Sequence, residues 1–133
     1  HGIAPDYRGE DTLFWGLWRR DYDKIGLTIH HIAERVDAGR ILARGYPALE
    51  PGDDLSTLQV KLAGLAGRML VDLLSCLEAR PGYLPEGQSQ EHMRGMLFRR
   101  SERRIWRDLA YRLGGRLYHR RLPRSEERIE RYY

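Results

Sequence analysis

The first 42 residues combine glycines, a proline, aromatic residues and one aspartate at closely defined intervals, a pattern that ordinary packing rarely requires. An early loop contains Pro5 and Tyr7-Arg8-Gly9, and a later stretch reads Gly26-Leu27-Thr28-Ile29-His30. It is followed by Val36-Asp37-Ala38-Gly39-Arg40-Ile41-Leu42. Glycines in such numbers indicate tight turns and close backbone approaches. The chain opens within this pattern and without Met, so we expect a piece of a longer protein.

Length and composition limit the fold to one domain, or part of one with a tail, built on 133 residues. With 32% charged residues and a mean hydropathy of −0.63, the core is expected to be thin. No apolar run approaches the roughly 20 residues that cross a bilayer, and no signal peptide is visible. The single Cys76 lies in an apolar helical pattern, which indicates a buried structural thiol and a cytoplasmic, reducing setting.

Charge is unevenly distributed along the chain. Residues 1–79 hold nine Lys or Arg against twelve acids, whereas residues 80–133 hold fourteen Arg and no Lys against seven acids. An arginine-rich tail is typical of contacts to phosphates, in a nucleic acid or a nucleotide-linked substrate. The coding bias of a GC-rich genome explains the arginine excess equally well, so both interpretations stay open.

Periodicity predicts a helix over residues 12–20, capped by Thr12, and two strands over residues 25–34 and 40–49. Alternation in the first strand places Thr28 and His30 on one face and His31 on the other. The strands are expected to pair antiparallel across residues 35–39, where Asp37-Ala38-Gly39 has turn chemistry.

A long helix is predicted next, capped by Asp54 or Ser56 and ending near Ala79, before Pro81-Gly82. Further along we expect a strand or extended arm over residues 93–99, a helix over residues 102–113 and a turn at residues 114–115. The arginine-rich residues beyond are expected to end in a helix.

Three groups of side chains are candidates for chemistry. Asp37, at the bend between the strands, is followed by Gly39, which leaves backbone room for a ligand; an Asx turn that satisfies its own backbone is the alternative. Arg8, beside Tyr7, suits a phosphate or carboxylate anchor, or an ion pair with a local acid such as Asp6 or Glu10.

His30 and His31 lie on opposite faces of one strand, and no His/Cys/Glu spacing supports a metal site. Trp15 and Trp18 are expected in the core.

Together, these motifs resemble the second half of the formyltransferase catalytic domain, which methionyl-tRNA, glycinamide ribonucleotide and sugar N-formyltransferases share. The resemblance covers about residues 1–80. The matching positions are Pro5, Tyr7-Arg8-Gly9, Trp15, Gly26, Thr28, His30, Asp37, Gly39 and Ile41-Leu42. It implies an α/β fold: a fragment of a Rossmann-like domain with an antiparallel hairpin, a long helix and an arginine-rich, mainly helical C-terminal extension. Residues 1–80 would form the catalytic half, and residues 81–133 the basic extension.

The resemblance also implies a reaction, in which a formyl group moves from 10-formyltetrahydrofolate to an amine. A family Asn, His and Asp surround that formyl group, and the Asp falls on Asp37. The family His falls one residue before His1, although His1 itself would serve if the loop has lost a residue. Arg8, Tyr7 and His30 are then substrate-binding candidates, and Asp37 and Gly39 are cofactor-binding candidates. A carboxylate suits this place because the attacking amine must lose a proton, while hydrogen-bond donors stabilise the developing oxyanion.

The acceptor remains open at this stage. Beyond Arg80 the sequence does not alternate like the barrel that follows in the methionyl-tRNA enzyme, so a nucleotide-linked sugar or another small metabolite is favoured over tRNA. Folate and a small amine are thus the expected partners, with tRNA an alternative and no membrane. A nucleic-acid-binding module or non-catalytic remnant that uses the arginine-rich tail is a further alternative. Alone, the chain is expected to be incomplete and inactive.

Overall fold

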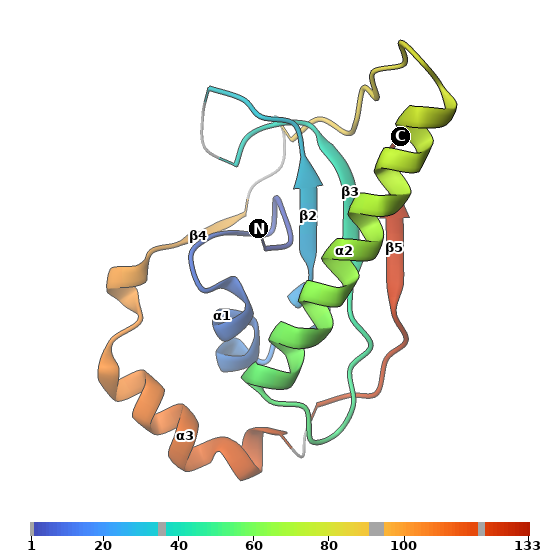
Figure 1. Ribbon diagram of the computed structural model, residues 1–133. Coiled ribbons are helices and arrows are strands. Elements are labelled where there is room, and N and C mark those ends of the chain that lie inside the picture. The colour runs from blue at the N-terminus through green and yellow to red at the C-terminus, as the bar shows by residue number, and fades with distance from the viewer. Residues whose placement is uncertain (1, 35–36, 91–94, 120–121) are drawn as a thin grey trace.

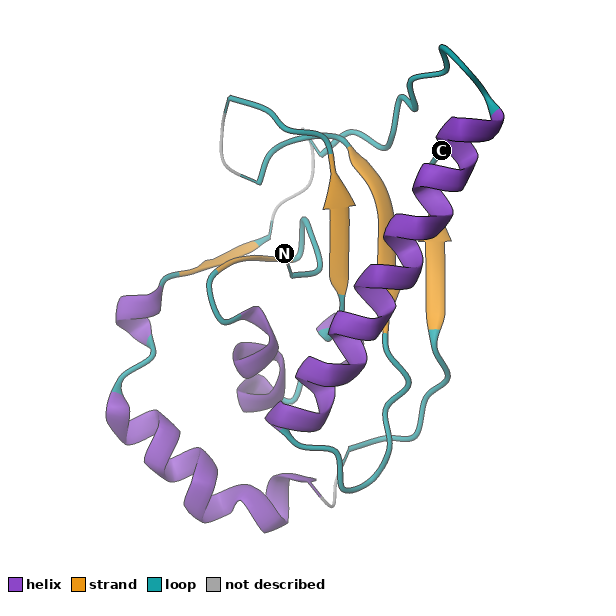
Figure 2. Cartoon of the chain, viewed as in Figure 1, coloured by secondary structure: helices purple, strands orange, loops and turns teal. Residues whose placement is uncertain are grey.

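The computed structural model describes residues 2–34, 37–90, 95–119 and 122–133 of a mixed α/β chain (Figure 1). Its elements are β1 Tyr7–Gly9, α1 Thr12–Arg19, the short helix η1 Tyr22–Lys24, β2 Leu27–His30, β3 Ile41–Tyr46, α2 Leu55–Ala79, β4 Met96–Phe98, η2 Arg100–Glu102, α3 Ile105–His119 and β5 Arg128–Arg131. Figure 2 shows α2 lying along a three-stranded sheet, with α1 beside the N-terminal end of α2 and α3 below α1 in this view. None of the helices in the described ranges combines the length and apolarity that a bilayer span requires.

The larger sheet has the order β2-β3-β5, with both pairs antiparallel. The predicted pairing of the first two strands is confirmed, although both strands are shorter than expected. The predicted helical end of the chain is wrong, because Arg128–Arg131 forms β5 and pairs with β3. Ile129 packs against the contact between the sheet and α2, and Arg131 pairs with Asp72 of α2. Three of the four residues of this strand are charged, so the sequence shows no alternation of apolar and polar residues there.

Helix α2 forms where the sequence predicts it. Asp54 is the N-cap: its Oδ1 accepts the Thr57 amide at 2.8 Å, and the Thr57 hydroxyl accepts the Asp54 amide at 2.7 Å. The helix packs closely on the sheet at Gly45, where a Cβ atom would lie 2.3 Å from the Met69 sulfur. Its buried side chains recur at helical spacing and are Leu58, Leu65, Met69 and Leu73.

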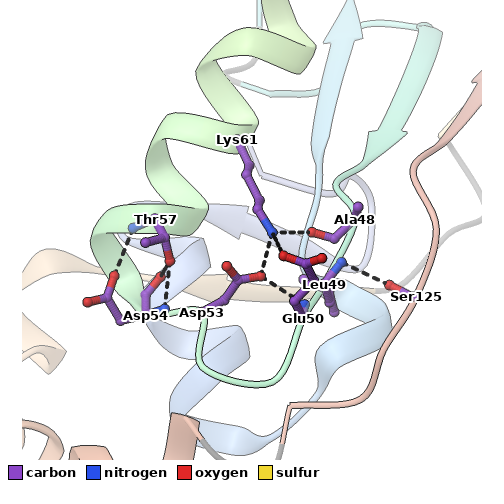
Figure 3. Close-up of polar contacts among 8 residues, drawn as sticks. All are labelled: Ala48, Leu49, Glu50, Asp53, Asp54, Thr57, Lys61 and Ser125. Atoms are coloured by element: carbon purple, nitrogen blue, oxygen red, sulfur yellow. Dashed lines mark hydrogen bonds and ion pairs between the residues drawn. The ribbon is translucent and has the colours of Figure 1, made fainter.

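Polar contacts fasten the turn before α2 to the helix (Figure 3). Lys61 Nζ lies 2.7 Å from Oδ2 of Asp53, whose side chain is only 8% exposed. The same oxygen accepts the Glu50 amide at 2.9 Å. Leu49 and Ser125 exchange backbone hydrogen bonds, so the C-terminal segment also joins this turn. The buried carboxylate is therefore paired, as burial of a charge requires.

Aromatic side chains dominate the core around α1. Tyr7, Phe14 and Trp15 are buried, and Trp15 stacks on Phe98 of β4. Trp18 is partly buried against the same cluster, so the predicted core location of both tryptophans is confirmed. Thr12 is the first residue of α1 rather than its cap.

The tail is joined to the first half of the chain by strand pairing. The extended arm predicted over residues 93–99 contains β4, which pairs in parallel with β1. The turn predicted at residues 114–115 is wrong, because α3 continues through it to His119. Tyr111 of α3 is buried in the aromatic core. The tail is thus less helical than expected, since it contributes a strand to each sheet.

Candidate functional site

The connection from β2 to β3 holds the acid that the sequence singles out. Asp37 has φ 58°, in the left-handed region that Asp and Asn tolerate better than most residues. Its side chain is only 21% exposed, and Oδ1 lies 3.9 Å from Nε2 of His30. The carboxylate therefore turns toward the end of β2.

His30 is oriented by its other ring nitrogen. Nδ1 lies 2.8 Å from the carbonyl oxygen of His31. A carbonyl only accepts, so Nδ1 carries the proton and donates it, which leaves Nε2 directed at Asp37.

Gly39 closes the loop that carries Asp37. A Cβ atom at this position would lie 1.6 Å from the carbonyl oxygen of His31 and 3.2 Å from Nδ1 of His30. Only glycine permits this backbone approach. The space beside Gly39 that the sequence suggests for a ligand is thus occupied on this side by the chain itself.

The N-terminal loop is fastened to the same two strands. Thr28, which is 4% exposed, accepts the Ala4 amide through Oγ1 at 2.9 Å. Arg44 of β3 donates from Nε to the Ala4 carbonyl at 2.8 Å. Strand β2 therefore contacts the N-terminal loop through Thr28, and it contacts Asp37 through His30. Pairing with β3 shifts between Ile29 and His30, so the alternation used for prediction is interrupted there.

Tyr7, a predicted substrate-binding residue, is 1% exposed and donates its hydroxyl to the Asp21 carboxylate. Burial, followed by the hydrogen bond to Asp21, raises the pKa of Tyr7. The Tyr7 hydroxyl in turn is the main cause that lowers the pKa of Asp21. The position of the Tyr7 side chain gives no support to a contact with substrate.

Arg8, the other predicted anchor in this loop, is half-buried in β1 opposite Leu97. Its Nε is buried and has no hydrogen-bond partner within the described residues. Asp6 pairs with Lys24 at 3.0 Å, and Glu10 accepts the Arg100 amide at 2.7 Å. These two acids are thus engaged by other residues, and a role for Arg8 in binding an anion stays a prediction.

Comparison with known proteins identifies the family. A family model described as Formyl transferase matches residues 1–74, more than half of the chain. The chain belongs to the formyl transferase family. The matched segment contains the N-terminal loop, Thr28, His30, Asp37 and Gly39.

Two similar proteins carry the name methionyl-tRNA formyltransferase. They come from Leptospira interrogans serogroup Icterohaemorrhagiae, serovar copenhageni (strain Fiocruz L1-130) and serovar Lai (strain 56601). Each is 33% identical to this chain over 82 residues, which is 61% of this chain and 26% of the relative. The chain thus spans about a quarter of the length of these relatives. No solved structure matches.

The β2–β3 connection exposes both a polar and an apolar side chain. Asp37 offers a partly exposed carboxylate, and in the same loop Ile32 is fully exposed. Among the described residues, no group of three or more His, Cys, Asp or Glu is arranged to hold a metal ion.

The sequence did not reveal some of the residues that support this site, and one predicted residue lies outside the described part of the chain. Thr28 was in the matching pattern, but its burial was missed, because alternation places it on the face opposite Leu27 and Ile29. Arg44 and Gln90, which both contact the site's backbone, gave no signal because their partners lie 40 or more residues away. His1 lies outside the described residues, and its catalytic role stays a prediction.

Proposed function

We propose that this formyl transferase segment acts in moving a formyl group from 10-formyltetrahydrofolate to an amine, with Asp37 accepting the amine's proton. The observation that supports this most is the contact between the Asp37 carboxylate and His30 Nε2. When bound, the donor supplies an activated formyl group. The chain supplies the group that takes up the proton.

Proton removal is the step that needs a carboxylate here. The attacking amine forms a bond to the formyl carbon, gains positive charge and must lose a proton, while the bond from that carbon to the donor nitrogen breaks and the departing nitrogen takes up a proton. A positioned base contributes typically about 10²–10⁴-fold to such a step. We assign this part to Asp37, with His30 as its neighbour: Nδ1 of His30 faces the His31 carbonyl, and Nε2 lies 3.9 Å from the Asp37 carboxylate.

The N-terminal loop is proposed to form the other wall of the site. Thr28 and Arg44 hold both backbone groups of Ala4, so the loop has a fixed position on the strand that carries His30. In the family resemblance this loop follows the Asn and His that stabilise the oxyanion. Preorganised donors of that kind are commonly the largest catalytic contribution, around 3 kcal/mol for one donor.

For the acceptor we favour the amine of a nucleotide-linked sugar or another small metabolite. This choice follows the sequence of the tail, whose described residues form α3 and two strands that pair with β1 and β3. Methionyl-tRNA is the second candidate. It is supported by the names of the two relatives and by the surface of α3, where Trp106 is 53% exposed among arginines.

The test is formyl transfer by the intact protein from 10-formyltetrahydrofolate with an isotope-labelled formyl group. The amine panel contains nucleotide-linked amino sugars, small metabolite amines and methionyl-tRNA, and unformylated amines are separated from products. Labelled amide in one class identifies the acceptor. A folded protein that labels none of these amines, and that leaves the donor intact, would contradict the proposed function.

If tRNA is the acceptor, binding should weaken steeply with salt, because arginine–phosphate contacts release counterions. Between Arg99 and Arg121 the sequence has nine arginines and two acids. Transfer to a small amine should change little over the same salt range. Salt dependence therefore separates the two acceptors even where both give some product.

A further inference from the structure

The segment that follows α2 returns to the hairpin and fastens its loop. Pro85 accepts a hydrogen bond from Nε2 of His31 at 2.7 Å. Arg40 donates from Nε to the Glu86 carbonyl at 2.7 Å and from Nη2 to the Gly87 carbonyl at 2.8 Å. Gln88, which follows Gly87, exchanges backbone hydrogen bonds with Ile41. We call residues 85–90 the hairpin strap.

The last residue of the hairpin strap contacts the backbone that carries the acid. Gln90 Nε2 donates to the carbonyl oxygen of Asp37 at 3.3 Å and to that of Gly39. An amide group has two N–H donors, so one Gln90 side chain satisfies both carbonyls. Its Oε1 is buried without a partner among the described residues, so only the donors of Gln90 contribute to this contact.

The two carbonyls lie on either side of the turn that sets the direction of Asp37. Asp37 has its backbone in the left-handed region, which persists only where surrounding contacts determine it. Gly39 packs on the His31 carbonyl, and Gln90 donates to the Gly39 carbonyl, so both contacts hold the loop. Without the Gln90 donors, both carbonyls lose this hydrogen bond and the turn can relax.

The chain beyond the strap contacts the other half of the site. A Cβ atom at Gly95 would lie 1.6 Å from the Pro5 carbonyl oxygen, and the Met96 amide donates to the Asp6 carbonyl at 2.8 Å. Residues that follow α2 therefore support both the hairpin loop and the N-terminal loop. Gln90, Gly95 and Met96, which make these contacts, lie outside the segment that the family model matches, whereas their partners lie inside it.

We propose that Gln90 is a positioning residue for formyl transfer, whose side-chain amide holds the Asp37 backbone so that the carboxylate faces His30. This inference rests on the proposed function of Asp37. Gln90 acts through the loop and takes no proton itself. Because a misplacement of about 1 Å can cost roughly 10²-fold in rate, a small shift of this loop should be visible in kcat.

The test uses two substitutions in the intact protein. Gln90→Met removes the donors and keeps an unbranched side chain of similar size, and Gln90→Glu keeps the shape but offers only acceptors at neutral pH. Both should lower kcat by roughly tenfold or more, with KM for donor and amine changed less than about threefold, because the loop positions the base. Glu86→Ala is the matched control: its side chain is 91% exposed and makes only an exposed ion pair with Arg40 at 3.9 Å, while the Glu86 carbonyl that accepts from Arg40 is kept. It should turn over like the wild type.

Hydrogen exchange of the backbone amides provides a second measurement that needs no activity. In both Gln90 variants the peptide covering residues 37–41 should exchange faster, while the peptide covering α2 should be unchanged. Lower kcat with unchanged exchange at residues 37–41 would overturn the positioning role, as would faster exchange with wild-type kcat. A loss of protection throughout the chain would also overturn it, since Gln90 would then serve the whole fold.

The two proposals fail in different ways. If the wild type transfers no formyl group to any amine, the proposed function is contradicted and the catalytic part of the Gln90 inference falls with it. The exchange measurement would still decide whether Gln90 holds the Asp37 loop. If the wild type is active and the Gln90 variants match it in kcat, only the Gln90 inference is overturned.

Discussion

At the scale of single residues, the site depends on the close approach of the Gly39 backbone to the His31 carbonyl. Because a Cβ atom there would lie 1.6 Å from the His31 carbonyl oxygen, Gly39→Ala must push the loop apart. We expect a loss of about 1–3 kcal/mol in the free energy of unfolding, as for other overpacked positions, and it is measured by urea titration. The control is Gly67→Ala on α2, where a Cβ atom meets nothing within 4 Å and alanine favours the helix. Equal effects of the two substitutions would contradict the close approach at Gly39.

A second residue-scale prediction concerns acid stability. The Tyr7 hydroxyl is the main cause that lowers the pKa of Asp21 in the folded protein. A carboxyl with a lowered folded pKa stabilises the fold above its unfolded pKa, and this contribution is lost as the pH falls through the folded value. The Tm of the wild type should therefore fall more between pH 6 and pH 2 than that of Asp21→Asn. Parallel Tm curves for the two proteins would show that the Tyr7–Asp21 contact contributes nothing to acid stability.

At the scale of elements, the start of α2 is predicted to depend on its cap. Asp54 forms a reciprocal pair of hydrogen bonds with Thr57, so Asp54→Ala should cost about 1 kcal/mol in the free energy of unfolding. Ser56→Ala, two residues further into the chain, should cost less than about 0.5 kcal/mol, as do most exposed positions. Urea titration of both variants checks this. A larger loss of stability for Ser56→Ala than for Asp54→Ala would contradict the assignment of Asp54 as the N-cap.

Elements with strong local signals were predictable, and those defined by distant partners were not. The period of α2 and the turn residues of the β2–β3 hairpin are local, so both elements were found. Strand β5 was missed because its four residues, Arg-Ile-Glu-Arg, contain one apolar side chain and become a strand by pairing with β3. The same reason applies within the site: Asp37 and Gly39 form a local pattern, whereas Gln90 reaches Asp37 from 53 residues away.

At the scale of the whole molecule, the C-terminal half completes structures that the first half begins. Strand β4 pairs with β1, β5 pairs with β3, and Tyr111 enters the aromatic core. A chain that ends after residue 80 should therefore lose both pairings and unfold at a lower urea concentration, or without a cooperative transition. Circular dichroism during urea titration measures this. An unchanged midpoint would show that residues 1–80 fold independently of the tail.

The proposed function as a whole depends on the Asp37 carboxylate taking up the amine's proton. Asparagine keeps the shape of the side chain and removes the base, so Asp37→Asn tests the chemistry with little change in packing. Asp23→Asn is the matched control, since Asp23 is 77% exposed and belongs to η1, outside the β2–β3 connection that carries Asp37.

The most direct measurement is the single-turnover rate of formyl transfer in the intact protein, compared for the wild type, Asp37→Asn and Asp23→Asn. We predict a loss of at least about 10²-fold for Asp37→Asn, from the usual contribution of a positioned base, with Tm close to that of the wild type. Asp23→Asn should keep the wild-type rate. Transfer by folded Asp37→Asn within a few-fold of the wild-type rate would contradict the role assigned to this carboxylate.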